Sequence, residues 1–176
     1  LAMIDKDLAD LVRFDVPPAP LHLSNSTDAF QPLERQTGHT HYALEQILAH
    51  RERFTTVTIL TKNPLLAAEA GYAELLRDIA QLRPNHPVYA DYAATGRPAL
   101  VVEVSLAFCR ESARAAYDPC APSVQERIDG IHALHAAGIP LVLRIDPMFP
   151  RSPLPGASTA SLADYGLPEA QTLEDL

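Results

Sequence analysis

The sequence predicts an α/β fold in which parallel strands are joined by crossover helices. Residues 54–61, 99–106 and 139–145 are rich in β-branched and other apolar side chains and predict buried strands. A helical pattern separates each of these strands from the next, and the short apolar stretch 21–24 adds a first strand. Such alternation indicates a parallel sheet with right-handed crossovers. Four strands fit either an open doubly wound sheet or part of a barrel, and the pattern alone does not choose between them.

The chain starts with a helix that leads into a polar loop. Residues 3–14 carry apolar side chains at helical spacing, and Pro17 and Pro18 end this helix. The strand 21–24 then runs into residues 24–28, which are all short and polar. Side chains of this kind hydrogen-bond nearby backbone, so we expect a polar loop where the first strand ends.

The middle of the chain alternates helix and strand. Residues 40–53 and 72–82 follow a helical pattern on either side of the strand 54–61. Asn63 is expected to cap a short helical turn that has Pro64 at its first position.

The best-marked helix of the chain is expected at residues 124–137, after a shorter one at 110–117. Ser123 and Glu126 form a capping box at its start, and Gly138 ends it. Its apolar stripe is expected to consist of Val124, Ile128, Ile131 and Leu134.

The composition fits one domain over residues 1–176, with a Pro-rich tail at 147–171. No apolar run is long enough to cross a bilayer and no signal peptide is visible, so we expect a cytoplasmic protein. The net charge of −8 argues against broad electrostatic binding of nucleic acid, which needs clustered lysine and arginine. Cys109 and Cys120 match neither a disulfide framework nor a metal-binding spacing.

Polar and charged side chains follow each predicted strand. Because the C-terminal ends of parallel strands carry the functional groups in such folds, we expect these side chains to meet at one edge of the sheet. In strand order they are Ser24, Asn25 and Asp28; Thr61 and Lys62; Ser105; Arg144 and Asp146. A lysine can neutralise a carboxylate, and amides and carboxylates can bind an amine or ribose hydroxyls. Together they predict a site for a zwitterionic, ribose-bearing ligand.

Each of these residues also has a purely structural interpretation. Lys62 can be a solvated loop residue, and Ser105 can be small only to allow close packing. Arg144 and Asp146 can pair with each other. The coincidence of such residues at four strand ends favours a binding site.

Four collinear segments carry a resemblance to a known family. NSTDAFQPLE at 25–34 is similar to NTDxYQPxE, TILTKN at 58–63 to a strand end with ITKS, and VEVSL at 102–106 to VSVT. The longest segment, 113–140, is similar to ARxxEPxAPSxxxRLxAIxxLxxAGIP. These patterns belong to the spore photoproduct lyase-like group of radical S-adenosylmethionine (SAM) proteins, which the chain resembles from about residue 20 to residue 150.

The resemblance implies a partial (β/α)6 barrel with SAM at the C-terminal ends of the strands. It places residues 24–28 near the methionyl amine and the ribose of SAM, and Lys62 and Ser105 near the methionyl carboxylate. The SAM-binding set that it implies is Ser24, Asn25, Asp28, Gln31, Lys62, Ser105, Arg144 and Asp146. Members of this family use a [4Fe–4S] cluster to cleave SAM reductively to a 5′-deoxyadenosyl radical, which abstracts hydrogen from a substrate.

The chain departs from the family pattern at the cluster. It lacks the family's CxxxCxxC motif, and Cys109 and Cys120 fall in a different part of the fold, so no metal ligand is assigned. We therefore expect the core fragment of a radical SAM enzyme, truncated at both ends and inactive alone. The alternative is a cluster-free module that binds SAM, a nucleotide or another protein.

The resemblance leaves the substrate open. DNA photoproduct repair belongs to one branch of the family, and the acidic balance of the chain gives no independent support for a nucleic-acid partner. No membrane partner is expected. An open half-barrel exposes strand edges and apolar surface, so self-association is an expected consequence.

Overall fold

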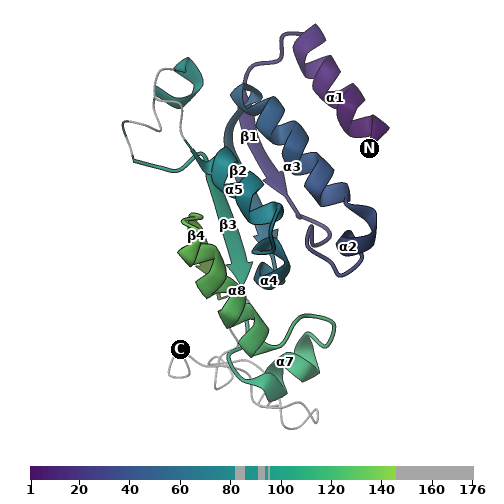
Figure 1. The fold of residues 1–176 in the computed structure, drawn as a ribbon, viewed down its shortest axis with the longest axis vertical. Helices are drawn as coiled ribbons and strands as arrows, with labels where there is room; N and C mark the ends of the chain where they lie inside the picture. Colours follow the sequence, from purple (N-terminus) through teal and green to yellow (C-terminus); the bar gives the residue numbers. More distant parts are fainter. Residues whose placement is uncertain (82–85, 91–93, 95, 146–176) are drawn as a thin grey trace, which may run out of the picture.

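The computed structural model describes residues 1–81, 86–90, 94 and 96–145, and its centre is a four-stranded sheet. All neighbouring strands are parallel, and they lie in the order β1-β2-β3-β4 (Figure 1). The strands are β1 (Ala19–Leu23), β2 (Phe54–Thr61), β3 (Leu100–Ser105) and β4 (Leu141–Arg144). The prediction of an α/β fold with parallel strands is confirmed, and the order of the described strands contains no reversal.

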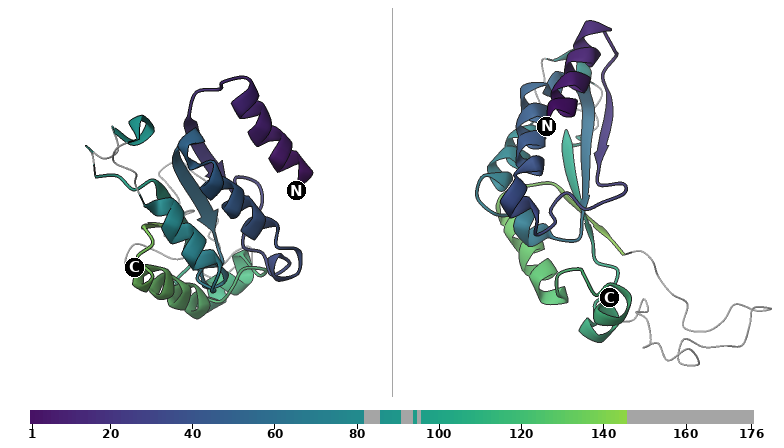
Figure 2. Two further views of the ribbon diagram at one scale, coloured as in Figure 1. Left: turned by 45° about the horizontal axis from the view of Figure 1, so that its top comes forward. Right: turned by 90° about the vertical axis from the view of Figure 1, so that its right-hand side faces the viewer.

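The helices that cross between the strands cover one face of the sheet. Figure 2 shows the sheet edge-on, with α3, α5 and α8 on the same side. The helical segments are α1 (Ala2–Arg13), α2 (Glu34–Thr37), α3 (His39–Ala49), α4 (Pro64–Ala67), α5 (Tyr72–Ala80), α7 (Glu111–Tyr117) and α8 (Val124–Ala136), with 3-10 turns η1 (Arg51–Arg53) and η2 (Pro87–Tyr89). The Asn63 cap of α4 and the Ser123–Glu126 capping box of α8 form as predicted.

The core lies between the sheet and these helices. Alternate strand residues that face the helices are fully or almost fully buried: Val57, Ile59, Leu100, Val102 and Val104. The strand residues between them, such as Thr58 and Glu103, point to the other side of the sheet and are only partly buried. We call this side the open face. Because side chains alternate along a strand, the covered face is mostly apolar, while the open face mixes polar groups with apolar residues such as Leu60 and Val101.

Two local expectations were wrong. The segment expected as one helix at 40–53 ends at Ala49 and continues as η1, while α2 precedes it and stops at Gly38, which has a left-handed φ of 61°. The first strand begins earlier than expected and contains Pro20, which is compatible with its place at the edge of the described sheet.

The buried face of α8 also differs from the predicted apolar stripe. Of the four stripe residues only Leu134 is buried, and the other buried positions on α8 are Arg127 and Gly130. Gly130 allows α8 to approach α4 closely, since a Cβ built there would lie 2.3 Å from the backbone nitrogen of Leu65. The buried face of α8 is therefore centred on Arg127, Gly130 and Leu134, while Ile131 packs against the core as a partly buried residue.

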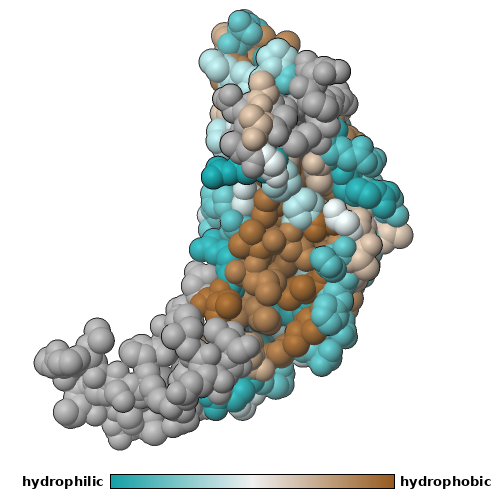
Figure 3. Space-filling view, turned by 90° about the vertical axis from the view of Figure 1, so that its left-hand side faces the viewer, coloured by the Kyte–Doolittle hydropathy of each residue, from teal (hydrophilic) through white to brown (hydrophobic). Residues whose placement is uncertain are grey.

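The edge strand β4 exposes apolar side chains. Val142 and Leu143 are 46% and 48% exposed although they point to opposite faces of the sheet. Figure 3 shows a broad apolar area on the side of the molecule where β4 lies. Among the described residues no strand pairs with the outer edge of β4. Such an edge can pair with another strand, and self-association stays a prediction. None of the helices in the described ranges is both long and apolar enough to cross a membrane.

The contact between α8 and α4 can be tested with Gly130→Ala. The added methyl group would collide with the backbone of Leu65, so α8 must shift. We expect a loss of about 1–3 kcal/mol in the free energy of unfolding, measured with urea. Ala133→Ser, on the exposed side of the same helix, is the control and should change stability by less than about 0.5 kcal/mol. A Gly130→Ala chain as stable as the unchanged chain would contradict this packing.

Candidate functional site

A pocket of about 390 Å³ lies where the four strands end. It is lined by Ser24, Asn25, Ser26, Thr27, Asp28, Leu60, Thr61, Lys62, Ser105 and Arg144. The strand ends therefore meet as the sequence predicts, and the pocket contains six of the eight residues in the predicted SAM-binding set. Of the other two, Gln31 lies elsewhere and Asp146 is outside the described residues.

The loop after β1 forms one wall of the pocket. It turns at Ser24, whose φ of 73° lies in the left-handed region that residues with a side chain rarely adopt. The Ser24 hydroxyl accepts a hydrogen bond from the Ala29 backbone N–H at 2.9 Å, which closes the loop. Backbone strain of this kind persists only where surrounding contacts hold it.

The residues at the tip of this loop are available to a ligand. Asn25, Ser26 and Thr27 are exposed, and their side chains make no hydrogen bond with any residue that the structure describes. They present one amide and two hydroxyls, which can both donate and accept hydrogen bonds.

Asp28 ties the loop to the end of β2. One carboxylate oxygen accepts from the Phe30 backbone N–H at 2.9 Å and from the Thr61 hydroxyl at 2.8 Å. The other accepts from the backbone N–H of Lys62 at 2.6 Å. Three hydrogen bonds within the chain thus occupy the Asp28 carboxylate. Asp28 therefore holds the loop against β2 and adds negative charge to the pocket, but it has little capacity left to accept hydrogen bonds from a ligand.

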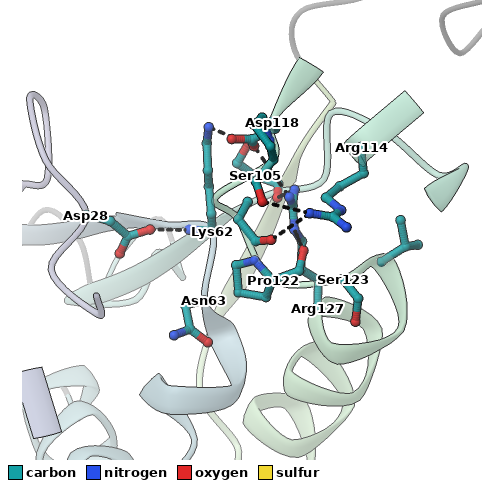
Figure 4. A network of polar contacts seen from close by, with 12 residues as sticks. Asp28, Lys62, Asn63, Ser105, Arg114, Asp118, Pro122, Ser123 and Arg127 are labelled. Carbon is teal, nitrogen blue, oxygen red and sulfur yellow. Dashed lines mark hydrogen bonds and ion pairs between the residues drawn. The ribbon is translucent and has the colours of Figure 1, made fainter. Parts of the chain in front are cut away.

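Lys62 extends from the end of β2 to Asp118 in the connection between α7 and α8 (Figure 4). Its ammonium nitrogen lies 2.8 Å from a carboxylate oxygen of Asp118, and its side chain is 47% exposed. The same oxygen lies 3.4 Å from the guanidinium of Arg127. Lys62 is therefore a paired cation in this structure and not a freely solvated one.

Arg127 is the anchor of this region. Its side chain is 0% exposed, and it donates to the backbone carbonyls of Ser105 and Pro122 at 3.1 Å each. Burial lowers the pKa of the Arg127 guanidinium, and the charge and hydrogen bond of Asp118 oppose that shift. Neither Arg127 nor Asp118 was predicted as part of the site. Arg127 matches the arginine of the APSxxxR part of the resembling segment, and it shares a helix face with Gly130 and Leu134, but neither feature was read as part of the site.

Ser105 ends β3 inside the pocket. The residue is only 8% exposed, and its hydroxyl makes no hydrogen bond with any described residue. Its carbonyl is held by Arg127, so the backbone that carries this hydroxyl is fixed. The Ser105 hydroxyl oxygen is not one of the described side-chain atoms that are buried without a partner, so it is open to the pocket, where water or a ligand can bond it.

The remaining predicted residues have other positions. Arg144 lines the pocket and pairs with Glu103 of the neighbouring strand at 3.1 Å, on the open face of the sheet. Gln31 lines a second cavity of about 380 Å³, on the other side of Lys62. That cavity is also lined by Arg35, Asn63, Asp118, Cys120 and Glu126, among others.

No metal centre is found in the described part of the chain. It contains no group of three or more histidine, cysteine, aspartate or glutamate side chains that could hold a metal ion. Cys109 is partly buried and Cys120 is exposed, and neither forms a disulfide. The described side chains therefore do not fit an iron–sulfur cluster, which needs cysteine thiolates.

Comparisons with models of known protein families, with curated proteins and with solved structures find no match for this chain. What the pocket can bind follows from its own residues.

Glu34 fixes the segment that leads away from the pocket loop. Its buried carboxylate accepts from the backbone N–H groups of Thr40 and His41 at 3.0 Å each, at the start of α3, and from the Tyr72 hydroxyl at 2.8 Å. Burial acts to raise the pKa of Glu34, but these hydrogen bonds outweigh it and the pKa falls below 4.5. Burial and the bond to Glu34 raise the pKa of Tyr72 to about 12.

This arrangement predicts a pH dependence that Glu34→Gln should weaken. Since folding lowers the pKa of Glu34, its contribution is complete above pH 4.5 and is lost as the pH falls through the folded value. We expect Glu34→Gln to cost about 1–2 kcal/mol at pH 7 and to reduce the loss of stability below pH 4.5, measured by urea unfolding at several pH values.

Tyr72→Phe serves as the comparison, because it leaves both backbone hydrogen bonds to Glu34 in place and should keep most of the acid dependence. If Glu34→Gln and the unchanged chain lost stability equally below pH 4.5, Glu34 would not be a source of the acid dependence.

Proposed function

We propose that the strand-end pocket binds SAM and that the chain is the core of a radical SAM enzyme of the spore photoproduct lyase-like group. The observation that carries the proposal is the Ser105 hydroxyl, which has no hydrogen-bond partner among the described residues, is open to the pocket and shares this pocket with Lys62. A ligand carboxylate would satisfy both groups, since it accepts hydrogen bonds from a hydroxyl and from an ammonium.

The other residues of the pocket suit the rest of SAM. The amide of Asn25 and the hydroxyls of Ser26 and Thr27 can bind ribose hydroxyls and the methionyl amine. The charge of Asp28 favours the ammonium and sulfonium groups at the same wall. The cavity volume of about 390 Å³ falls within the range of small-molecule sites, about 300–1,000 Å³.

A partial (β/α)6 barrel is the architecture that we propose for this chain. The sequential strand order supports it, because right-handed crossovers between consecutive strands keep all helices on one face. The open face then corresponds to the inside of the barrel, and Ser105, Leu60 and Arg144 lie at its C-terminal end. Active sites of such barrels lie at that end.

The described residues do not fit an iron–sulfur cluster. If the natural protein carries a [4Fe–4S] cluster, its ligands are outside the described residues. The part proposed for this chain is to hold SAM by its carboxylate at Lys62 and Ser105 and by its ribose at the loop after β1.

Titration with SAM tests the binding proposal. We expect Ser105→Ala to weaken SAM binding by about fivefold, the cost of about one hydrogen bond, in isothermal titration calorimetry. Lys62→Met keeps most of the aliphatic stem and should weaken binding by about tenfold. Ser112→Ala, on the exposed surface of α7, is the matched control and should bind SAM like the unchanged chain.

Absence of SAM binding by the unchanged chain would contradict the proposal and favour a protein-interaction module. SAM binding that Ser105→Ala and Lys62→Met leave unchanged would place the ligand outside this pocket.

Reconstitution tests the enzymatic part. We expect the natural protein that contains this chain, treated anaerobically with iron and sulfide, to bind about four iron atoms per chain. On reduction it should cleave SAM to 5′-deoxyadenosine, detected by chromatography. SAM binding without iron would instead support the cluster-free module.

A further inference from the structure

The cation proposed to hold the ligand carboxylate already has an internal partner. The Lys62 ammonium lies 2.8 Å from Asp118, and Lys62 lines both the strand-end pocket and the second cavity. Of these two cavities, Asp118 lines the second and not the first. Figure 4 shows the Lys62 side chain pointing towards Asp118. In this structure, the charge of Lys62 is therefore directed at a carboxylate of the chain itself.

Of the two partners, Asp118 is the fixed one. Its side chain is 18% exposed, and the buried Arg127 guanidinium lies 3.4 Å from the same oxygen that contacts Lys62. Its backbone carbonyl accepts from the Ala121 N–H at 3.1 Å, which holds the turn after α7. The side chain of Lys62 is 47% exposed and has a flexible four-carbon stem. When the pair separates, the lysine moves.

We propose that Asp118 is a resident counter-ion that competes with the ligand's anionic group for Lys62. This inference rests on the proposed function, in which a ligand carboxylate reaches Lys62 in the strand-end pocket. An incoming carboxylate exchanges with Asp118 at the ammonium, while Asp118 keeps its contact with Arg127. No charge is left buried without a partner during the exchange, so the exchange avoids the large penalty for such a state.

Asp118 could either compete with the ligand for Lys62 or position Lys62 for the ligand, and the two roles change ligand affinity in opposite directions. If Asp118 aimed Lys62 at the ligand, removal of its charge would weaken binding. If Asp118 competes, removal of its charge frees the ammonium and also removes repulsion between two carboxylates. The effect is confined to ligands that carry an anionic group, so the same substitution should not change the affinity for the adenosine part alone.

Asp118→Asn distinguishes these two signs. The probes are S-adenosylhomocysteine, which has the methionyl-type carboxylate but no sulfonium charge, and 5′-methylthioadenosine, which lacks the amino-acid group. We expect Asp118→Asn to bind S-adenosylhomocysteine about fivefold more tightly, the upper value for a partly exposed ion pair, and 5′-methylthioadenosine unchanged. Glu126→Gln removes the same charge from the wall of the second cavity, where Glu126 bonds Ser123, and should change neither affinity.

A measurement on the unchanged chain covers the case in which Asp118→Asn does not fold. The variant is expected to fold, because Arg127 keeps the carbonyls of Ser105 and Pro122 as acceptors. In chain labelled with ¹³C at aspartate, the side-chain carboxyl resonance of Asp118 should shift when S-adenosylhomocysteine saturates the pocket. It should not shift with 5′-methylthioadenosine.

The outcomes separate this inference from the proposed function. If the unchanged chain binds S-adenosylhomocysteine but Asp118→Asn binds it equally or more weakly, competition is wrong and the pocket assignment stands. An Asp118 resonance that stays unmoved while S-adenosylhomocysteine binds overturns competition in the same way. If neither chain binds SAM or S-adenosylhomocysteine, the proposed function and the inference both fail.

Discussion

The buried guanidinium of Arg127 is the group on which the geometry of the strand-end site depends. A charge without access to water needs hydrogen-bond acceptors and an opposite charge close by, because the cost of leaving it unpaired is several kcal/mol. Arg127 finds them in the carbonyl of Ser105 at the end of β3 and in the carbonyl of Pro122 and carboxylate of Asp118, both in the connection between α7 and α8. The end of β3 and the partner of Lys62 are therefore held by one side chain.

Close packing of α8 makes that position of Arg127 feasible. Gly130 lets the helix approach α4 until the two backbones touch, and α4 directly follows Lys62 and Asn63. The capped turn at Asn63 and the carboxylate of Asp28 then fix the end of β2 against the loop after β1. Three separate connections thus converge on one edge of the sheet, and the open face ends there in a pocket lined by Ser105, whose hydroxyl has no partner among the described residues.

Local signals in the sequence account for most of the fold. Runs of β-branched residues, the Asn63 cap and the Ser123–Glu126 capping box act over a few residues, and each of these elements forms where it is expected. The rule that parallel strands end at one edge also brings together residues 24–28, Lys62 and Ser105. The order of the strands is not a local property, so the choice between a doubly wound sheet and a sequential one needed the structure.

The parts that could not be predicted depend on contacts between distant segments. An arginine in a helical pattern normally indicates a solvated position, and only the approach of α8 to α4 reveals that Arg127 is buried. Asp118 lies far along the chain from Lys62, and no spacing rule links the two. Gln31 belongs to the same short motif as Asn25 and Asp28, yet the turn after Asp28 carries it to the second cavity.

The central claim is that the strand-end pocket is the SAM site, and a crystal structure of the chain with SAM tests it most directly. We expect the methionyl carboxylate of SAM to lie within hydrogen-bond distance of both the Ser105 hydroxyl and the Lys62 ammonium, with Lys62 turned away from Asp118. SAM bound in the second cavity, or bound with the Ser105 hydroxyl still without a partner, would contradict it.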